Sequence, residues 1–159
     1  MGAAYDALSD DIKAYLEDKV AVHDFMKLHG SPKKFRSWEG DNWKRMEASR
    51  VANPPITHPV IKVHPVTGRK SLYISESFTA SILDVSEDES RGLLDMLNRH
   101  CARPEFQCRF HWRPNSVALW DNRSTSHYAC ADYWPERRLM NRVTIETDEL
   151  GTASAEAAE

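Results

Sequence analysis

The chain has 159 residues, a length typical of one domain that buries roughly two-thirds of its unfolded surface. Hydrophobic residues account for 41% and charged residues for 28% of the sequence, the composition of a soluble globular protein, and no apolar run is long enough to cross a membrane. The 21 basic and 24 acidic residues are well mixed and give a net charge of −3, so the sequence does not predict the basic surface that nucleic-acid binding requires.

The N-terminus, residues 1–6, has no basic stretch followed by an apolar stretch and so lacks the pattern of a secretion signal. We therefore expect a cytoplasmic location. The three cysteines agree with this expectation, because Cys101, Cys108 and Cys130 are odd in number and lack the C-x-x-C spacing of a zinc or redox site. We expect them to be reduced thiols packed as small hydrophobic residues.

Residues 1–28 are predicted to form a helical segment. Ser9 has the character of an N-cap, and Asp10 and Asp11 place negative charge in the first turn that follows it. Apolar residues then recur at helical spacing, at Ile12, Tyr15, Leu16 and Val20. A stripe of this kind must pack against another element of the fold.

Residues 29–55 are predicted to form a lid-like loop. The segment is rich in charge, glycine and proline, shows no sustained hydrophobic period, and ends in Asn53-Pro54-Pro55. A short helix is expected around residues 43–48. Loops of this length in compact domains are often functional lids, which is why we consider the segment a candidate lid.

After this loop the hydrophobic period changes to two. Residues 60–63 and 71–75 are predicted strands, joined over 64–68 by a turn whose proline and glycine suit a reversal of the chain. A helix is predicted next, because Ser86 and Glu89 have the spacing of a capping box. Its apolar face would consist of Leu93, Leu94 and Leu97.

The last third of the chain predicts three further strands. In residues 106–113, Phe, Cys, Phe and Trp alternate with polar residues, so one face of that strand is expected to be buried. A turn at 114–115 leads to a second strand over 117–120, and a third runs over about 139–146. Residues 151–159 have the Ala- and Glu-rich composition of a disordered tail.

These elements predict a fold that is mainly β with helical insertions. Strands late in the chain, helices outside them and no alternation of strand with helix are typical of an antiparallel β-sandwich or jelly roll. The sequence supplies about five strands, whereas a closed double-sheet jelly roll needs about eight. We therefore expect residues 1–150 to form a single domain, a partial jelly roll that lacks its N-terminal strands and has its core strands in residues 56–150.

The stretch WDNRSTSHYACADYWPERRLMNRVTI, residues 120–145, contains the candidate functional residues. His127 lies in a turn-rich loop and is a candidate metal ligand, the alternative being a hydrogen-bonded structural histidine. Arg138 and Arg142 are four residues apart in a predicted strand and so share one face, where two guanidinium groups need anionic partners. Those partners are either a bound carboxylate, sulfonate or phosphate, or nearby acidic side chains, namely Asp132, Glu136 and Asp148.

Four segments of the sequence closely resemble the C-terminal half of the taurine dioxygenase family, the iron(II)- and 2-oxoglutarate-dependent oxygenases of the taurine and phenoxyacetate type. The segments are HPVIKVHPVTGRKSLYI, FTASILDVSEDES, PEFQCRFHW and WDNRSTSHYACADYWPERRLMNR. The resemblance runs from about residue 3 to residue 148 and is dense after residue 53. It extends over far more residues than a short motif and is correspondingly specific.

The resemblance implies a double-stranded β-helix enzyme whose iron is bound by two histidines and one carboxylate. It implies that His127 is the second iron-binding histidine and that Arg138 binds the distal carboxylate of 2-oxoglutarate. It further implies that Arg142 meets the acidic group of the prime substrate and that Phe78 packs against that substrate. Iron(II), 2-oxoglutarate, O2 and a small sulfonate or carboxylate substrate are thus the expected cofactor and reactants.

One motif that binds iron in the family is missing from this sequence. The family's first two iron ligands lie in a His-x-Asp or His-x-Glu motif, yet none of the seven histidines here is followed two places later by a carboxylate. The sequence resembles an N-terminally shortened family member. We therefore expect this chain alone to bind iron weakly and to turn over slowly or not at all.

Two hypotheses account for this gap. In the first, the chain is a fragment of a working dioxygenase, or a complementary N-terminal half in a separate chain completes the enzyme. A homo-oligomer is also expected, because missing strands would leave unpaired sheet edges. In the second, the chain is a degenerate, non-catalytic binding or interaction module that retains an anion pocket around Arg138 and Arg142. Taurine itself is not the expected substrate, because Leu28 and His29 replace a serine and an aromatic residue that contact the substrate in the taurine enzymes.

Overall fold

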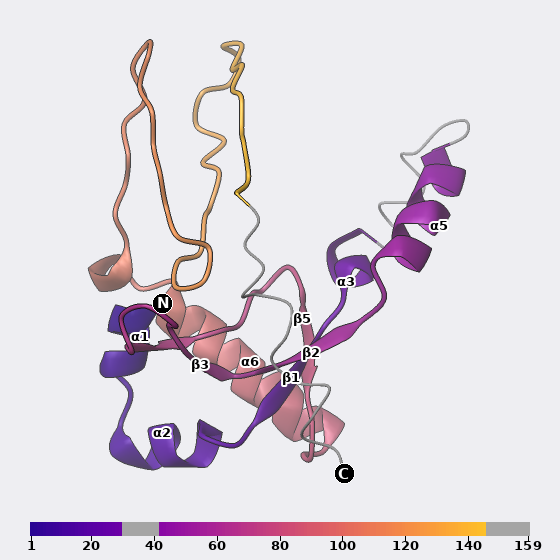
Figure 1. Cartoon of the computed structure of the whole chain (residues 1–159), viewed down its shortest axis with the longest axis vertical. Coiled ribbons are helices and arrows are strands. Elements are labelled where there is room, and N and C mark those ends of the chain that lie inside the picture. Colours follow the sequence, from indigo (N-terminus) through magenta and orange to yellow (C-terminus); the bar gives the residue numbers. More distant parts are fainter. Residues whose placement is uncertain (30–41, 146–159) are drawn as a thin grey trace. The chain divides into compact units, whose positions relative to one another are not determined.

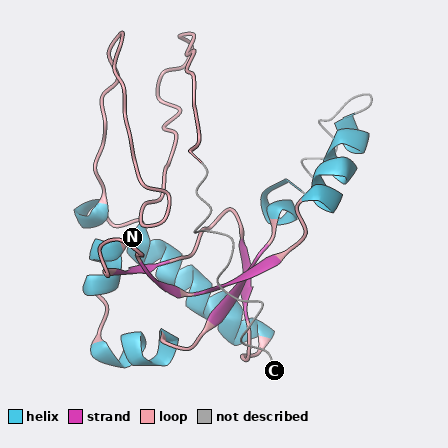
Figure 2. Cartoon of the chain, viewed as in Figure 1, coloured by secondary structure: helices cyan, strands magenta, loops and turns pink. Residues whose placement is uncertain are grey.

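The structure is a computed structural model that describes residues 1–29 and 42–145 (Figure 1). The chain divides into two compact units, residues 1–127 and residues 128–159, and each is considered by itself. Within the described ranges, all helices and strands belong to the first unit. Figure 2 shows short strands beside helices of different lengths, with long loops after the last helix.

The N-terminal segment is helical only in part. Helices α1 (Gly2–Asp6) and α2 (Asp10–Leu16) form as two short elements, and Ser9 caps α2 by accepting a hydrogen bond from the backbone N–H of Ile12. The Ser9 N-cap is therefore confirmed. The helical assignment of residues 20–23 is wrong, because Val20–His23 form strand β1, where two β-branched valines suit an extended backbone.

Strand β1 is the centre of a three-stranded antiparallel sheet with the order β2-β1-β5. Its neighbours are β2 (Ile56–Pro59) and β5 (Thr79–Ile82), and Ala21 stands opposite residues of both. Sequence patterns did not predict these three strands. Each is four residues long, too short for alternation to be distinguished from chance.

The predicted hairpin is confirmed as strands β3 (Ile61–Val63) and β4 (Lys70–Leu72), which pair antiparallel. The turn between them closes when the backbone N–H of Gly68 donates to the carbonyl oxygen of His64 at 2.9 Å. Gly68 has φ of +67°, a left-handed conformation that favours glycine. This turn also fixes the backbone of His64 at the end of β3.

The predicted capping box is confirmed at the start of helix α6 (Glu87–Cys101). The Ser86 hydroxyl accepts from the backbone N–H of Glu89, and the Glu89 carboxylate accepts from the backbone N–H of Ser86. The face of α6 that carries Leu94 and Leu97 packs into the hydrophobic core. The other buried apolar residues of this core are Ala4, Leu8, Leu16, Ala21, Val60, Ile61, Leu72, Ile74 and Ile82.

Two further helices follow β1 in the chain. Helix α3 (Phe25–His29) was not predicted, and α5 (Asn42–Ala52) is a longer form of the short helix expected around residues 43–48. Residues 30–41, which make up much of the predicted lid-like loop, lie outside the described residues, as does the predicted tail. No described helix combines the length and apolar character needed to cross a membrane.

The three strands predicted for the last third of the chain are not found in the part that the structure describes, which ends at residue 145. A 3-10 helix, η1 (Pro104–Phe106), is followed over residues 107–145 by turns and irregular backbone without a strand. The predicted turn at 114–115 does form, since the backbone N–H of Ser116 donates to the Arg113 carbonyl oxygen at 3.0 Å. Alternation specifies which face a strand would bury, but a strand also needs a partner backbone.

The observed architecture is therefore a set of small antiparallel sheets with helices. Several exposed large apolar side chains of residues 107–145 lie in the predicted strands. They include Phe110, Trp112, Val117, Leu119, Leu139, Val143 and Ile145. Whether these segments form part of a jelly roll stays a prediction.

Candidate functional site

His127 ends the first unit and lies just after a tight turn over residues 121–125. The backbone N–H groups of Ser124 and Thr125 both donate to the carbonyl oxygen of Asp121, at 3.3 and 3.0 Å. The His127 side chain is exposed, and its ring stacks on that of Trp120 with centroids 4.9 Å apart and planes 14° from parallel. The two stacked rings thus stand at the two ends of the turn.

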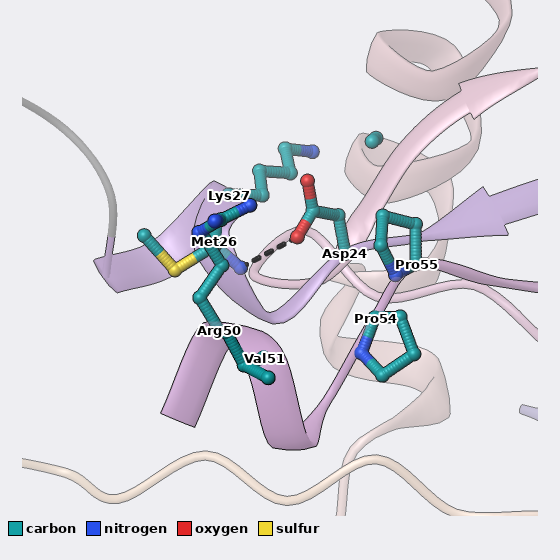
Figure 3. Close-up of a pocket in the computed structure, with 8 residues that line it drawn as sticks. Asp24, Met26, Lys27, Arg50, Val51, Pro54 and Pro55 are labelled. Carbon is teal, nitrogen blue, oxygen red and sulfur yellow. Dashed lines mark hydrogen bonds between the residues drawn. The ribbon is translucent and has the colours of Figure 1, made fainter. Parts of the chain in front are cut away.

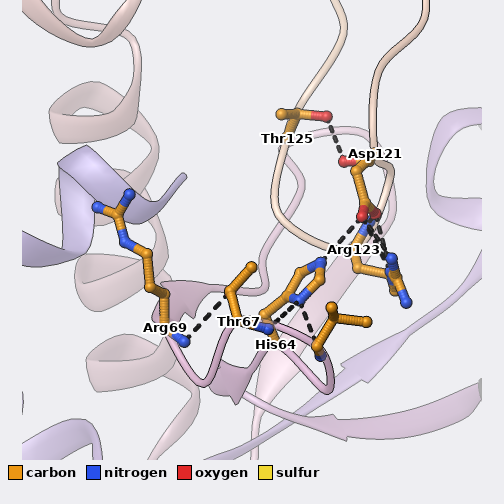
Figure 4. Close-up of polar contacts among 7 residues, drawn as sticks. His64, Thr67, Arg69, Asp121, Arg123 and Thr125 are labelled. Carbon is orange, nitrogen blue, oxygen red and sulfur yellow. Dashed lines mark hydrogen bonds and ion pairs between the residues drawn. The ribbon is translucent and has the colours of Figure 1, made fainter.

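The Asp121 carboxylate is the hub of this turn (Figure 4). It accepts hydrogen bonds from the guanidinium and the backbone N–H of Arg123, the shortest being 2.6 Å from Nη2. It also accepts from Nε2 of His64 at 2.9 Å. These donors, with Arg123 the strongest, hold the pKa of the Asp121 carboxyl well below its usual range, so the group is an anion at neutral pH.

The tautomer of His64 follows from its second ring nitrogen. Nδ1 lies 3.2 Å from the backbone nitrogens of both Val66 and Thr67, whose N–H groups donate to it. An Nδ1 that accepts carries no proton, so the proton of the neutral ring is on Nε2 and points to Asp121. Sequence analysis missed this pair because 57 positions separate the two residues, although His64 opens the predicted turn.

Phe78 lies in the loop before β5 and is 38% exposed. Its carbonyl oxygen accepts from the backbone N–H of Asp24 at 2.8 Å, and its own N–H donates to the Ser75 carbonyl oxygen. Asp24 in turn accepts from the backbone N–H of Met26 at 2.7 Å and starts helix α3. Phe78 is thereby hydrogen-bonded to the backbone of Asp24, and Asp24 lines a cavity.

That cavity has a volume of about 600 Å³ and was not predicted from the sequence (Figure 3). Its lining combines two cationic residues, one carboxylate and several apolar groups, namely Asp24, Met26, Lys27, Arg50, Val51, Pro54, Pro55 and Ala80. The Lys27 ammonium donates to the Thr79 carbonyl oxygen at 2.5 Å. The mixture of charges and apolar surface suits a small organic molecule with an acidic group.

A cluster of rings on β1, β2 and the residue after β4 is a second feature that the sequence did not reveal. The ring centroid of His23 lies 5.4 Å from that of His58 and 5.6 Å from that of Tyr73, and the Lys62 ammonium lies 4.0 Å from the Tyr73 centroid. Burial, then the positive charges of His58, Lys62 and Lys27, lowers the pKa of His23 to about 4. His23 is therefore neutral at pH 7.

Arg138 and Arg142 belong to the second unit. The Arg138 Nε–H donates to the sulfur of Met140, and its guanidinium lies 5.4 Å from the centroid of the Tyr133 ring. Arg142 is exposed. The expectation that both point to one face assumed a strand, and the described backbone around them is not one; ion pairs with acidic neighbours stay open as the alternative. That His127 converges with these arginines also stays a prediction, because it belongs to the other unit.

The three cysteines are free thiols, as expected. Cys101 packs against the core, and burial raises the pKa of its thiol. Cys108 is exposed, so the expectation that it packs as a small hydrophobic residue is wrong. Cys108 is exposed because the predicted strand over residues 106–113, which was expected to bury it, does not form.

The described residues do not fit a complete iron site. Throughout residues 1–29 and 42–145, no three His, Cys, Asp or Glu side chains are grouped in a way that could hold a metal ion. This agrees with the lack of a His-x-Asp motif in the sequence. His127 is thus a single candidate ligand.

Comparison with known proteins identifies what this chain is similar to. The family described as "Taurine catabolism dioxygenase TauD, TfdA family" matches residues 1–144. An alkylsulfatase of Acinetobacter baylyi is 36% identical over 143 residues, which cover 89% of this chain and 44% of the relative. An (S)-phenoxypropionate/alpha-ketoglutarate-dioxygenase of Sphingobium herbicidovorans is 34% identical over 93% of this chain and 50% of its own length.

A solved structure gives the same result. The crystal structure of AAD-2 in complex with Mn(II) and N-oxalylglycine has a TM-score of 0.55 and 37% sequence identity, over 71% of this chain and 41% of AAD-2. The chain therefore spans half or less of the length of each of these three proteins.

Proposed function

This chain belongs to the taurine catabolism dioxygenase TauD, TfdA family, and we propose that it is the C-terminal part of a 2-oxoglutarate-dependent dioxygenase acting on a small sulfonate or carboxylate. The observation that carries the proposal is the family match over residues 1–144, which includes the stretch with His127, Arg138 and Arg142. The named activities of the relatives, an alkylsulfatase and a phenoxypropionate dioxygenase, support an acidic substrate. A cytoplasmic location remains a prediction from the sequence.

We propose that each of four residues has one binding role. His127 supplies one imidazole to iron(II), and Arg138 binds the distal carboxylate of 2-oxoglutarate, because a planar guanidinium can donate two parallel hydrogen bonds to a carboxylate. Arg142 meets the acidic group of the substrate. Phe78 contributes an aromatic surface that packs against the substrate.

The remaining iron ligands are proposed to come from a segment that the given sequence does not contain. Support comes from three facts: no histidine here precedes a carboxylate by two places, the described residues hold no group of three ligands, and the chain spans half or less of its relatives. A separate N-terminal polypeptide, or a longer protein of which this chain is a fragment, could supply that segment. The second candidate, a non-catalytic module that only binds anions, is favoured by the same lack of grouped ligands.

A spectroscopic experiment tests whether the chain is self-sufficient. Under anaerobic conditions, iron(II) and 2-oxoglutarate are added to the full chain, and the visible charge-transfer band of a chelated complex is sought. We expect no band, because one imidazole does not hold iron(II) against water. A saturable band that disappears in His127→Ala would show that the chain completes its own iron site, and the proposed missing segment would be wrong.

Calorimetry tests the role of Arg138 and separates the two candidate functions. We expect 2-oxoglutarate to bind weakly without metal and the affinity to fall at least tenfold in Arg138→Ala. Arg137→Ala is the matched control, since Arg137 is the exposed neighbour of Arg138, and it should change the affinity less than twofold. Equal losses in both variants would contradict a specific carboxylate site.

The anaerobic spectroscopic experiment, repeated with an added N-terminal segment of a relative, distinguishes part of a dioxygenase from an anion-binding module. Appearance of the visible band only in the mixture supports the first candidate. Binding of 2-oxoglutarate through Arg138 without any band in the mixture supports the second.

A further inference from the structure

The turn before His127 is hydrogen-bonded to one residue at the end of strand β3, His64. We propose that His64 is a positioning residue, which fixes the orientation of the His127 ring through its hydrogen bond to Asp121. The inference rests on the proposed role of His127 as a ligand, because that role gives the orientation of the ring its importance. All residues involved belong to the first unit.

The hairpin provides a rigid base for His64. Its strands are anchored by the buried side chains of Ile61 and Leu72, and the side chain of His64 itself is 8% exposed. Two backbone N–H groups of the hairpin turn donate to Nδ1, as described above, so both the position of the ring and its tautomer are fixed. The Nε2 proton therefore has one direction, toward Asp121.

Asp121 transmits this constraint to the whole turn. Its carboxylate joins His64 to Arg123, and its carbonyl oxygen accepts from the hydroxyl of Thr125 (Figure 4). The same carbonyl oxygen also accepts from the backbone N–H groups of Ser124 and Thr125. Side-chain and main-chain atoms of one residue thus bond to Arg123, Ser124 and Thr125 of the turn. Charge-assisted hydrogen bonds of this kind are stronger than neutral ones, so the link to His64 is a substantial constraint.

The ring of His127 depends on this turn because its side chain is exposed. Core packing does not restrict an exposed imidazole, and the stacking of His127 on Trp120 joins the residue directly before the turn to a residue two places after it. If Asp121 is released from the hairpin, the two flanks of the turn can separate and the stacking should weaken. A residue 63 positions earlier in the chain would in this way control the candidate ligand.

Ring-current shifts in the full chain measure the stacking directly. Protons of the His127 ring are followed by NMR in a histidine-labelled sample, assigned by their loss in His127→Gln, and Trp120→Leu gives the value without stacking. We expect His64→Asn, whose amide can accept at the Nδ1 position but cannot reach Asp121, to move the His127 shift at least halfway to that value. His64→Gln, whose amide nitrogen can occupy the Nε2 position, should restore most of the wild-type shift.

His111→Asn is the matched control, because His111 is an exposed histidine that the Asp121 network does not include, and it should leave the His127 shift unchanged. A wild-type His127 shift in folded His64→Asn would overturn the proposal. If His64→Asn fails to fold, Asp121→Ala, which removes both carboxylate oxygens, is measured in its place, with the same expected direction and the same overturning result.

The result of this NMR experiment can be distinguished from the result of the experiments that test the proposed dioxygenase function. Ring shifts that move as expected in a chain that forms no visible band with iron(II) and 2-oxoglutarate, even with the N-terminal segment of a relative added, would leave the positioning role intact and remove the proposed dioxygenase activity. An unmoved ring in a chain that does bind them would remove the positioning role alone.

Discussion

Residues 1–106 and residues 107–145 use apolar side chains in opposite ways. Val60 and Leu97 of the first region are 0% exposed, whereas Val117 and Leu119 of the second are both 89% exposed. Every buried member of the hydrophobic core precedes residue 107. Yet three of the four predicted site residues, His127, Arg138 and Arg142, lie in the second region, while the stability of the fold comes from the first.

The difference teaches that an apolar pattern in the sequence forms a buried strand or helix only where another element is present to pack or pair with it. In the first region β1 has β2 and β5 beside it, and α6 covers the buried core, so the pattern is satisfied. In the second region the alternation of residues 106–113 is as regular as any in the chain, but the described backbone has no neighbouring strand to bond with. The same physical rule thus gives a strand in one place and an exposed loop in the other.

The largest expected effect compares two leucine truncations. Leu97→Ala removes a fully buried side chain and should lower the free energy of unfolding by about 2–5 kcal/mol, since it leaves a cavity. Leu119→Ala removes an exposed side chain and should change it by less than about 0.5 kcal/mol. Urea denaturation followed by circular dichroism measures both. A loss above about 1 kcal/mol in Leu119→Ala would mean that the second region is buried in solution, and the comparison would break.

The second prediction concerns pH and the His23 cluster of the first region. Because His23 has a folded pKa of about 4 against 6.5 when unfolded, the unfolded state binds more protons between these values. Stability is therefore fully present above pH 6.5 and is lost as the pH falls from 6.5 toward 4. The loss should be at most about 2 kcal/mol, after allowance for solvent screening of a half-buried group.

The cause lies in the surroundings of His23. His58, Lys62 and Lys27 are all cationic or become so on protonation, and each lowers the pKa of His23, while burial contributes most. His58 should add to the same acid sensitivity, since burial and Lys62 lower its pKa too. Urea denaturation at pH 7 and pH 5 in His23→Gln should show a smaller difference than in wild type. The control His111→Gln changes an exposed histidine of the second region, and an equal reduction there would contradict the assignment.

Features of the fold were predictable from the sequence where the interacting residues lie close together in the chain. Ser9 and Ser86 were recognised as caps because both partners of each hydrogen bond lie within three positions, and the hairpin around Gly68 was recognised from its turn. Strands β1 and β5 were missed because their pairing joins residues about 60 positions apart, as in His23 with Thr79. No short window of sequence contains that information.

The candidate site shows the same division. The resemblance identified His127, Arg138, Arg142 and Phe78 as site residues, and those roles stay predictions. The pairing of His64 with Asp121 lay hidden, since 57 positions of the chain separate the two residues. The cavity beside Asp24 was hidden for the same reason, as its walls come from α3, α5 and β5.

The smallest expected effect compares two serines that each accept a hydrogen bond from a local backbone N–H. Ser86→Ala removes the capping box of α6 and should cost about 1 kcal/mol, because α6 packs on the core and its fraying is coupled to unfolding. Ser116→Ala removes the bond from the Arg113 N–H at 3.0 Å, a contact as good in geometry, within an exposed turn of the second region. That turn can open without disturbing the core, so the free energy of unfolding should change by less than about 0.3 kcal/mol. Equal losses in denaturant titrations would show that the two regions unfold as one cooperative unit, and that partners for residues 107–145 exist within the chain in solution.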